Sequence, residues 1–91
     1  MYLYIIECKE PLRDLYKIGI TNDLEKRLKN IKTGNPYPVK FVFQQERNDA
    51  SKIERWLHSQ FNDNRMEGEW FHSLSVEEIR KKIFMFNDIL L

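Results

Sequence analysis

The alternation of apolar and polar residues predicts three strands along the chain. Three stretches are rich in β-branched and aromatic residues, as strands are: residues 2–7, 15–20 and 39–45. The first two are separated by the charged, proline-containing stretch 9–14, which predicts the loop of a hairpin. In the third stretch, alternate apolar residues are expected to point toward one face: Val39, Phe41 and Phe43.

Apolar residues at helical spacing predict three helices. The first begins after a cap at Asn22, has Glu25 three residues on, and ends at Gly34. Its expected buried stripe is Leu24, Leu28 and Ile31. The second begins at Asn48-Asp49, and its apolar side is Ala50, Ile53, Leu57 and Phe61. The third begins at the capping box Ser75 to Glu78, and its inward residues are Val76, Ile79, Ile83 and Phe86.

Together these elements predict an α+β fold of order ββαβαα, with a three-stranded, mainly antiparallel sheet flanked by helices. A hairpin needs helices to cover its apolar face, because two strands alone are not stable in water. Residues 62–68 predict a polar loop, and residues 69–71 predict either a short edge strand or an ordered turn. A chain of 91 residues allows one domain, which we place at residues 1–91.

Composition excludes several classes of protein. Apolar residues make up 42% and aromatic residues 13%, enough for one core, and three glycines and three prolines exclude a fibrous or disordered chain. The sequence contains no run of about 18 apolar residues, so no membrane span is predicted. Residues 1–6 lack the length and the basic start of a signal peptide. The single cysteine, Cys8, cannot form a disulfide framework or a zinc site. We therefore expect a cytoplasmic protein that does not bind membranes.

The distribution of charge is more informative than the net charge of +1. Residues 1–40 carry eight Lys/Arg and five Asp/Glu, a net +3, whereas residues 41–91 carry seven and nine, a net −2. A basic front of this kind can meet phosphates. An imbalance of this size is equally common in small domains with no such role.

Candidate chemistry begins on the two paired strands. Tyr4 lies on the first, and Tyr16, Lys17 and Gly19 lie on the second, so these residues can meet on one surface. A glycine at a strand end lets a backbone or a phosphate come close. Lys17 stands between apolar neighbours, which fits a solvent-facing strand residue or a partner of phosphate or water. Taken singly, the tyrosines are more typical of the edge of a core.

The predicted helices add three polar candidates. Arg27 lies on the flank of the first helix's stripe, where its planar fork could bind a phosphate, although a lone arginine there is usually a surface residue. Glu54 and His58 lie one turn apart on the second helix. A single carboxylate can hold a hydrated Mg²⁺, and the histidine could tune it or contact phosphate. If they have no function, Glu54 is a salt-bridge partner and His58 is a surface histidine. The pair is not a zinc motif, because no further ligands lie nearby in the sequence.

The order of five segments carries more information than any one residue. LYII, YKIGITNDLEKRL, KTGNP, IERWLHSQF and GEWF together resemble the GIY-YIG nuclease superfamily. The resemblance is greatest to a branch of small phage, bacterial and fungal proteins with a KIG signature, typified by a phage open reading frame and a meiotically up-regulated gene. It covers about residues 2–72.

The resemblance implies hydrolysis of a phosphodiester in DNA with one divalent metal, Mg²⁺ or Mn²⁺. By position, Glu54 would hold the metal, Tyr4 would help to deprotonate water, and Arg27 would neutralise charge on the phosphate. Lys17 replaces the second signature tyrosine, and His58 matches a histidine common in this branch. Tyr16, Gly19 and Arg65 are weaker candidates for contacts to phosphate. We interpret Glu69 and Arg65 as neighbours of the site, and Trp70 and Phe71 as core residues; Asn62 and Asn64 both lie near the position of a family asparagine.

Three functions therefore remain open: a metal-dependent DNA endonuclease, a nucleic-acid-binding module that does not cut, and a protein-interaction or inhibitor factor. In the third case, the tail at residues 83–91 would form a homodimer or a partner surface. The nuclease hypothesis makes one geometric prediction. The side chains of Tyr4, Lys17, Arg27 and Glu54 must meet in one pocket.

Overall fold

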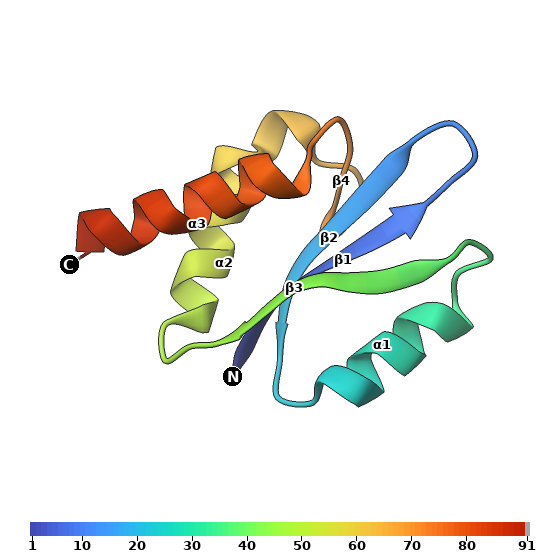
Figure 1. Cartoon of the computed structure of the whole chain (residues 1–91), viewed down its shortest axis with the longest axis horizontal. Coiled ribbons are helices and arrows are strands. Elements are labelled where there is room, and N and C mark those ends of the chain that lie inside the picture. The colour runs from blue at the N-terminus through green and yellow to red at the C-terminus, as the bar shows by residue number, and fades with distance from the viewer. Residues whose placement is uncertain (91) are drawn as a thin grey trace.

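A four-stranded antiparallel sheet forms the centre of the molecule (Figure 1). The computed structural model describes residues 1–90, with side chains for residues 1–88. The strands lie in the order β3-β1-β2-β4, and their bounds are β1 (Tyr2–Lys9), β2 (Asp14–Thr21), β3 (Val39–Glu46) and β4 (Trp70–Phe71). The predicted count of three strands is thus wrong by one. The alternative of an edge strand at residues 69–71 is the one that forms, and two residues are too few to give a periodic signal.

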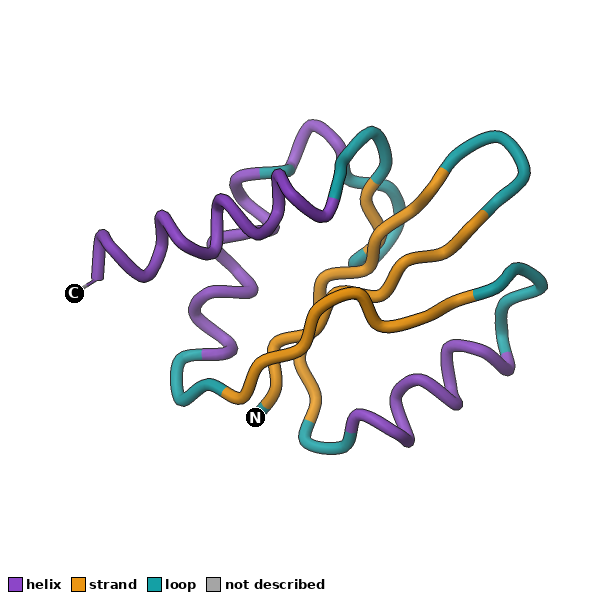
Figure 2. Tube along the Cα trace, in the orientation of Figure 1, coloured by secondary structure: helices purple, strands orange, loops and turns teal. Residues whose placement is uncertain are grey.

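Helices cover both faces of the sheet. Figure 2 shows two of them on one side and one on the other. Their bounds are α1 (Leu24–Thr33), α2 (Ala50–Gln60) and α3 (Val76–Leu90), and a short 3₁₀ turn, η1, follows α2 (Asn62–Asn64). The α+β class is confirmed, but β4 lies between α2 and α3, so the observed order is ββαβαβα. None of the described helices has the length and apolar character needed to cross a membrane.

The larger core lies between the sheet and the helices α2 and α3. It consists of alternate residues of β1 and β2, Phe71 of β4 and residues from the predicted apolar sides of the two helices: Leu3, Ile5, Tyr16, Ile18, Ile53, Leu57, Phe61, Phe71, Ile79, Ile83 and Phe86. The exposed residues of α3 include Phe84 and Met85. The candidate partner surface at residues 83–91 includes residues 89–91, whose side chains lie outside the described part of the chain.

The smaller core lies under α1. Tyr4, Ile6, Cys8, Leu15 and Val39 form it, and the three stripe residues of α1 pack against it half-buried rather than buried. The predicted stripe therefore faces the sheet. It stays partly open because α1 covers this face alone among the described helices (Figure 1).

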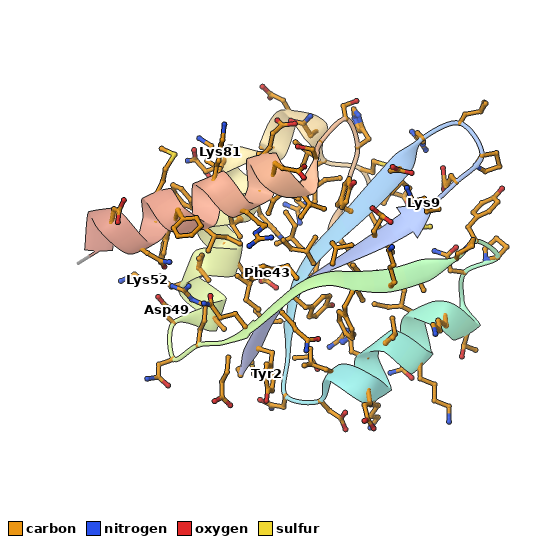
Figure 3. All side chains as sticks on the ribbon, in the orientation of Figure 1. Tyr2, Lys9, Phe43, Asp49, Lys52 and Lys81 are labelled. Atoms are coloured by element: carbon orange, nitrogen blue, oxygen red, sulfur yellow. The ribbon has the colours of Figure 1, made fainter. Side chains whose placement is uncertain are left out.

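A β-bulge corrects the predicted orientation of the third strand. Ile5 pairs with Phe43 and Ile6 with Phe41, so Val42 is an extra residue without a partner in β1. One extra residue reverses the alternation of side chains. Phe41 consequently packs under α1, while Val42 and Phe43 pack under α2 and α3; Phe43 is labelled in Figure 3.

The helix caps differ from the prediction in detail. The N-cap of α1 is Asp23, not Asn22, because the Asp23 carboxylate accepts from the Lys26 amide at 3.0 Å while Thr21 Oγ1 accepts from the Asp23 amide. Gly34 is the C-cap, as predicted. Ser75 Oγ accepts from the Glu78 amide at 3.1 Å, which confirms the start of α3.

Candidate functional site

The site forms where the outer edge of β2 loses its partner strand. β4 pairs only with Tyr16 and Lys17, and no described strand pairs with this edge further along. At the next residue, Ile18, the backbone amide donates to the carbonyl of Glu69 at 3.2 Å. The carbonyl of Ile18 accepts from His58 Nε2 at 2.8 Å. A carbonyl oxygen can only accept, so His58 carries its proton on Nε2. These two bonds bring α2 and the turn before β4 to the same point.

Gly19 makes room for two polar groups at this edge. It pairs with Tyr4, whose ring is fully buried and whose hydroxyl has no hydrogen-bond partner among the described residues. A Cβ atom on residue 19 would lie 2.5 Å from Tyr4 Oη and 3.0 Å from Glu69 Oε2. No side chain fits there without displacing them. The phenol and the carboxylate therefore border the same small space.

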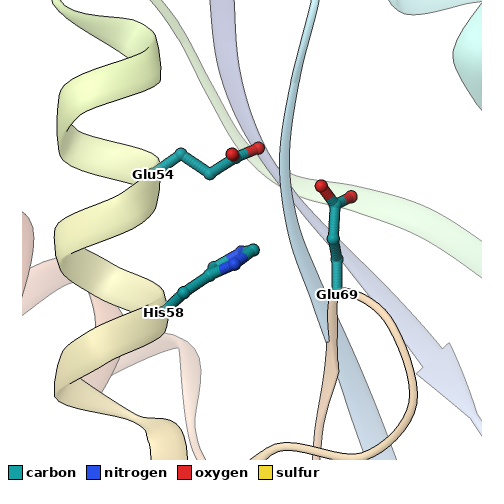
Figure 4. Close-up of side chains that lie close together, drawn as sticks. All are labelled: Glu54, His58 and Glu69. Carbon is teal, nitrogen blue, oxygen red and sulfur yellow. The ribbon is translucent and has the colours of Figure 1, made fainter.

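Two carboxylates and an imidazole gather beside this space. One ligand atom each from Glu54, His58 and Glu69 lie within 4.8 Å of one another, and Figure 4 shows the side chains pointing into the gap between α2 and the turn. Lys17 Nζ lies 3.4 Å from Glu69 Oε2 and 5.4 Å from the centre of the Trp70 ring. Carboxylate oxygens and a histidine whose other nitrogen donates to a backbone carbonyl are typical ligands of a divalent cation, so the residues present fit such an ion.

Burial and like charge raise the pKa of two groups in the site. The pKa of Glu54 rises from 4.5 to about 6, chiefly because of burial and then because of the neighbouring Glu69; Lys17 and Arg27 lower it. Burial also raises the pKa of Tyr4 to about 12, against the lowering effect of Arg27. At neutral pH without a cation, Tyr4 is therefore a hydrogen-bond donor.

Arg27 approaches the site from α1. It is half-buried and borders a surface hollow of about 240 Å³ together with Lys26 and Asn30. Its charge acts on both Tyr4 and Glu54, although these two belong to different elements. Lys29 is exposed on the same helix. The hollow that Arg27 borders is lined by Thr21 and Asp23 as well, and by none of the other candidate site residues, so Arg27 is connected to them by its charge rather than by a shared pocket.

The structure brings together six of the residues selected from the sequence: Tyr4, Lys17, Gly19, Arg27, Glu54 and His58. Two others lie elsewhere. Tyr16 is buried on the opposite face and donates to Glu7 Oε2 at 3.4 Å, which removes it from the site. Arg65 donates from Nε to the Gly68 carbonyl at 2.7 Å and so holds the turn rather than a phosphate.

Glu69 is the residue whose position sequence reasoning underestimated. The sequence predicts only a neighbour of the site, whereas in the structure Glu69 forms an ion pair with Lys17 and lies in the cluster with Glu54. The available signal was the glycine before it, because Gly68 adopts a φ of 65°, a conformation that turns the chain sharply. Of the two asparagine candidates, Asn64 donates from its side chain to the carbonyls of His72 and Ser73, so its contacts are to the backbone near β4.

Comparison with known proteins found one family. The model of the T5orf172 domain matches residues 1–87 of the chain. Neither the curated proteins nor the solved structures gave a match.

Proposed function

The chain belongs to the T5orf172 domain family, a phage-associated domain with a nuclease-like fold, and we propose that it is a divalent-metal-dependent endonuclease that hydrolyses phosphodiester bonds in DNA. Family membership points to a function connected with nucleic acid. The observation that carries the finer proposal is the grouping of Tyr4, Lys17 and Glu54 around Glu69 at one sheet edge, with Arg27 near enough for its charge to lower the pKa of both Tyr4 and Glu54. This is the constellation that the resemblance to GIY-YIG nucleases requires.

Glu54 is the residue that would hold the cation in this proposal. Its carboxylate is half-buried at the gap between α2 and β2, where an ion would meet a phosphate entering from solvent. Mg²⁺ or Mn²⁺ at this point supplies Lewis-acid polarisation of the phosphodiester and stabilises the leaving oxygen. A carboxylate whose pKa is raised to about 6 is still mostly ionised at neutral pH and available as a ligand.

Arg27 and Lys17 supply the positive charge for the phosphate. The guanidinium of Arg27 can bind two phosphoryl oxygens at once, and this contact strengthens as negative charge grows in the transition state. Lys17 holds Glu69 in the free protein and lies beside the same space. Both cations come from elements that the sheet fixes in place, so little reorganisation is needed when DNA binds.

Tyr4 is the group that would orient the attacking water. Its hydroxyl is buried and unpaired, so a water or a phosphate oxygen that reaches it gains a hydrogen bond that the free protein lacks. With a pKa of about 12, the hydroxyl is protonated at neutral pH, and Tyr4 could act as a base only as the phenolate, which further positive charge nearby would favour by lowering this pKa. Arg27 already lowers the pKa of Tyr4, and a cation bound by Glu54 would lower it further.

A cleavage assay tests the proposal. Supercoiled, linear, branched and single-stranded DNA are incubated with the purified protein and Mg²⁺ or Mn²⁺, beside the Glu54→Gln variant and a chelator control. The proposal predicts nicking or cutting that the chelator and the substitution both abolish. Cleavage that persists in folded Glu54→Gln protein would refute it. DNA binding that survives chelation, falls steeply with salt and leads to no cleavage would instead favour a binding module.

A further inference from the structure

Glu69 is held in the site by its backbone. The segment from Arg65 to Phe71 folds back on itself, with the Met66 amide donating to the Trp70 carbonyl at 2.8 Å and Arg65 Nε donating to the Gly68 carbonyl at 2.7 Å. The Glu69 carbonyl accepts from the amide of Ile18 in β2. A residue in an ordinary surface loop has no such anchors. The turn delivers one carboxylate to the edge of β2.

The carboxylates of Glu54 and Glu69 face each other, although the positively charged side chain of Arg27 lies close by. Ligand atoms of Glu54, Glu69 and His58 lie within 4.8 Å of one another, while Arg27 forms no ion pair among residues 1–88. Two anions at this separation repel each other in the free protein, and a divalent cation between them removes the repulsion. Ligand atoms on one Mg²⁺ lie about 3 to 4 Å apart, so small side-chain movements would close the set.

The buried hydroxyl of Tyr4 is an independent sign of an absent partner. Tyr4 is fully buried, its Oη has no partner in the part of the chain that the structure describes, and it borders the space occupied by Glu69 Oε2. A buried polar atom without a partner costs free energy unless a ligand or water meets it. The space beside Glu69 therefore suits a further polar partner in addition to the Lys17–Glu69 ion pair.

We propose that Glu69 is a second carboxylate ligand, which with Glu54 and a ring nitrogen of His58 forms a three-residue divalent-cation site. Lys17 keeps the Glu69 carboxylate in position in the free protein and yields it to the cation. His58 fits its part, because Nε2 donates to the Ile18 carbonyl and leaves Nδ1 with a free lone pair. The inference rests on the proposed function but assigns a ligand beyond Glu54.

Cation binding without DNA tests the inference separately from cleavage. Mn²⁺ affinity is measured by titration calorimetry and by the Mn²⁺ electron paramagnetic resonance signal, for the wild type and for Glu54→Gln, Glu69→Gln and Glu67→Gln. Glu67 is an exposed residue of the same turn and serves as the matched control. We expect Glu69→Gln and Glu54→Gln each to weaken binding about tenfold or more, with Glu67→Gln unchanged. Circular dichroism establishes that each variant is folded, and Glu69→Asp, which keeps the charge, should retain part of the affinity.

The outcomes separate the inference from the proposal it rests on. Binding that depends on Glu54 but is unchanged in Glu69→Gln overturns the inference and leaves the nuclease proposal intact. An absence of Mn²⁺ binding in the wild type overturns both. Under the competing explanation, Glu69 serves only to neutralise Lys17. In that case Lys17→Met and Glu69→Gln should change binding alike, whereas the inference predicts that Lys17→Met keeps or strengthens it.

Discussion

Gly19→Ala is the smallest change that disturbs the site, and its effect can be worked out from the structure. The added methyl group would lie 2.5 Å from Tyr4 Oη and 2.7 Å from Tyr4 Cζ, closer than carbon and oxygen atoms approach without bonding. Tyr4 cannot easily move, because its ring is fully buried and stands edge-on to Phe41 with centroids 5.8 Å apart. Overpacking of this kind destabilises a core by about 1–3 kcal/mol.

The assay for Gly19→Ala is urea or thermal unfolding followed by circular dichroism. Each kcal/mol should lower Tm by about 4–8 °C in a domain of this size. Gly34→Ala is the matched control, because its methyl group would meet only the Asn30 carbonyl oxygen at 4.0 Å. In a double-mutant cycle, Tyr4→Phe removes the closest contact, so Gly19→Ala should cost less in that background. If Gly19→Ala were as stable as Gly34→Ala, the proposed crowding of Tyr4 and Glu69 around residue 19 would be wrong.

Three further predictions concern charge. The pKa of Glu54 is about 6 in the folded protein and 4.5 in the unfolded chain, so without a divalent cation Glu54 contributes fully to the free energy of unfolding below pH 4.5, and this contribution is lost as the pH rises through 6. Urea unfolding with a chelator should show a loss of about 1 kcal/mol, allowing for solvent screening. The loss should be absent in Glu54→Gln. An equal pH dependence in both proteins would contradict this. Arg27→Lys keeps the charge but loses the two-pronged guanidinium, so DNA cleavage should fall about 100-fold while DNA binding changes little. The control Lys29→Ala should only weaken DNA binding. Equal turnover in Arg27→Lys and wild type would argue against the role of Arg27. Arg47 donates to Asp49, Gln45 and Asn87, so Arg47→Ala should destabilise the protein by about 1–3 kcal/mol, unlike Arg55→Ala on the exposed side of α2. The hydrogen bond from Arg47 lowers the pKa of Asp49, so this cost should shrink as acid protonates the carboxyl group, and a cost independent of pH would speak against it.

The regular elements could be predicted because their signals are local. The spacing of Ile53 and Leu57, or of Ile79 and Ile83, reports one helix face whatever the rest of the chain does, and both pairs are buried as expected. The bulge at Val42 has no such local signal. It depends on how β3 registers against β1, so the reversal between Phe41 and Phe43 could not be read from their alternation.

The site was predictable where residue type and segment order coincided, and not where tertiary contacts decide. Tyr4, Arg27 and Glu54 stand at positions that the resemblance marks, and in the structure the charge of Arg27 lowers the pKa of the other two. Tyr16 is adjacent to Lys17, but successive residues of a strand face opposite ways, which sends it to the other core. The position of Glu69 depends on the positive φ at Gly68 and on the bond to Ile18, which join segments about fifty residues apart.

The most direct test of the account is the position of a bound ion together with a phosphate. Crystals grown with Mn²⁺ and a short DNA oligonucleotide would locate the ion by its anomalous scattering. The account predicts one peak in contact with the Glu54 carboxylate at the open edge of β2, with a phosphate between that ion and Arg27. An ion bound elsewhere, or DNA lying on a face that leaves Arg27 and Glu54 untouched, would contradict it.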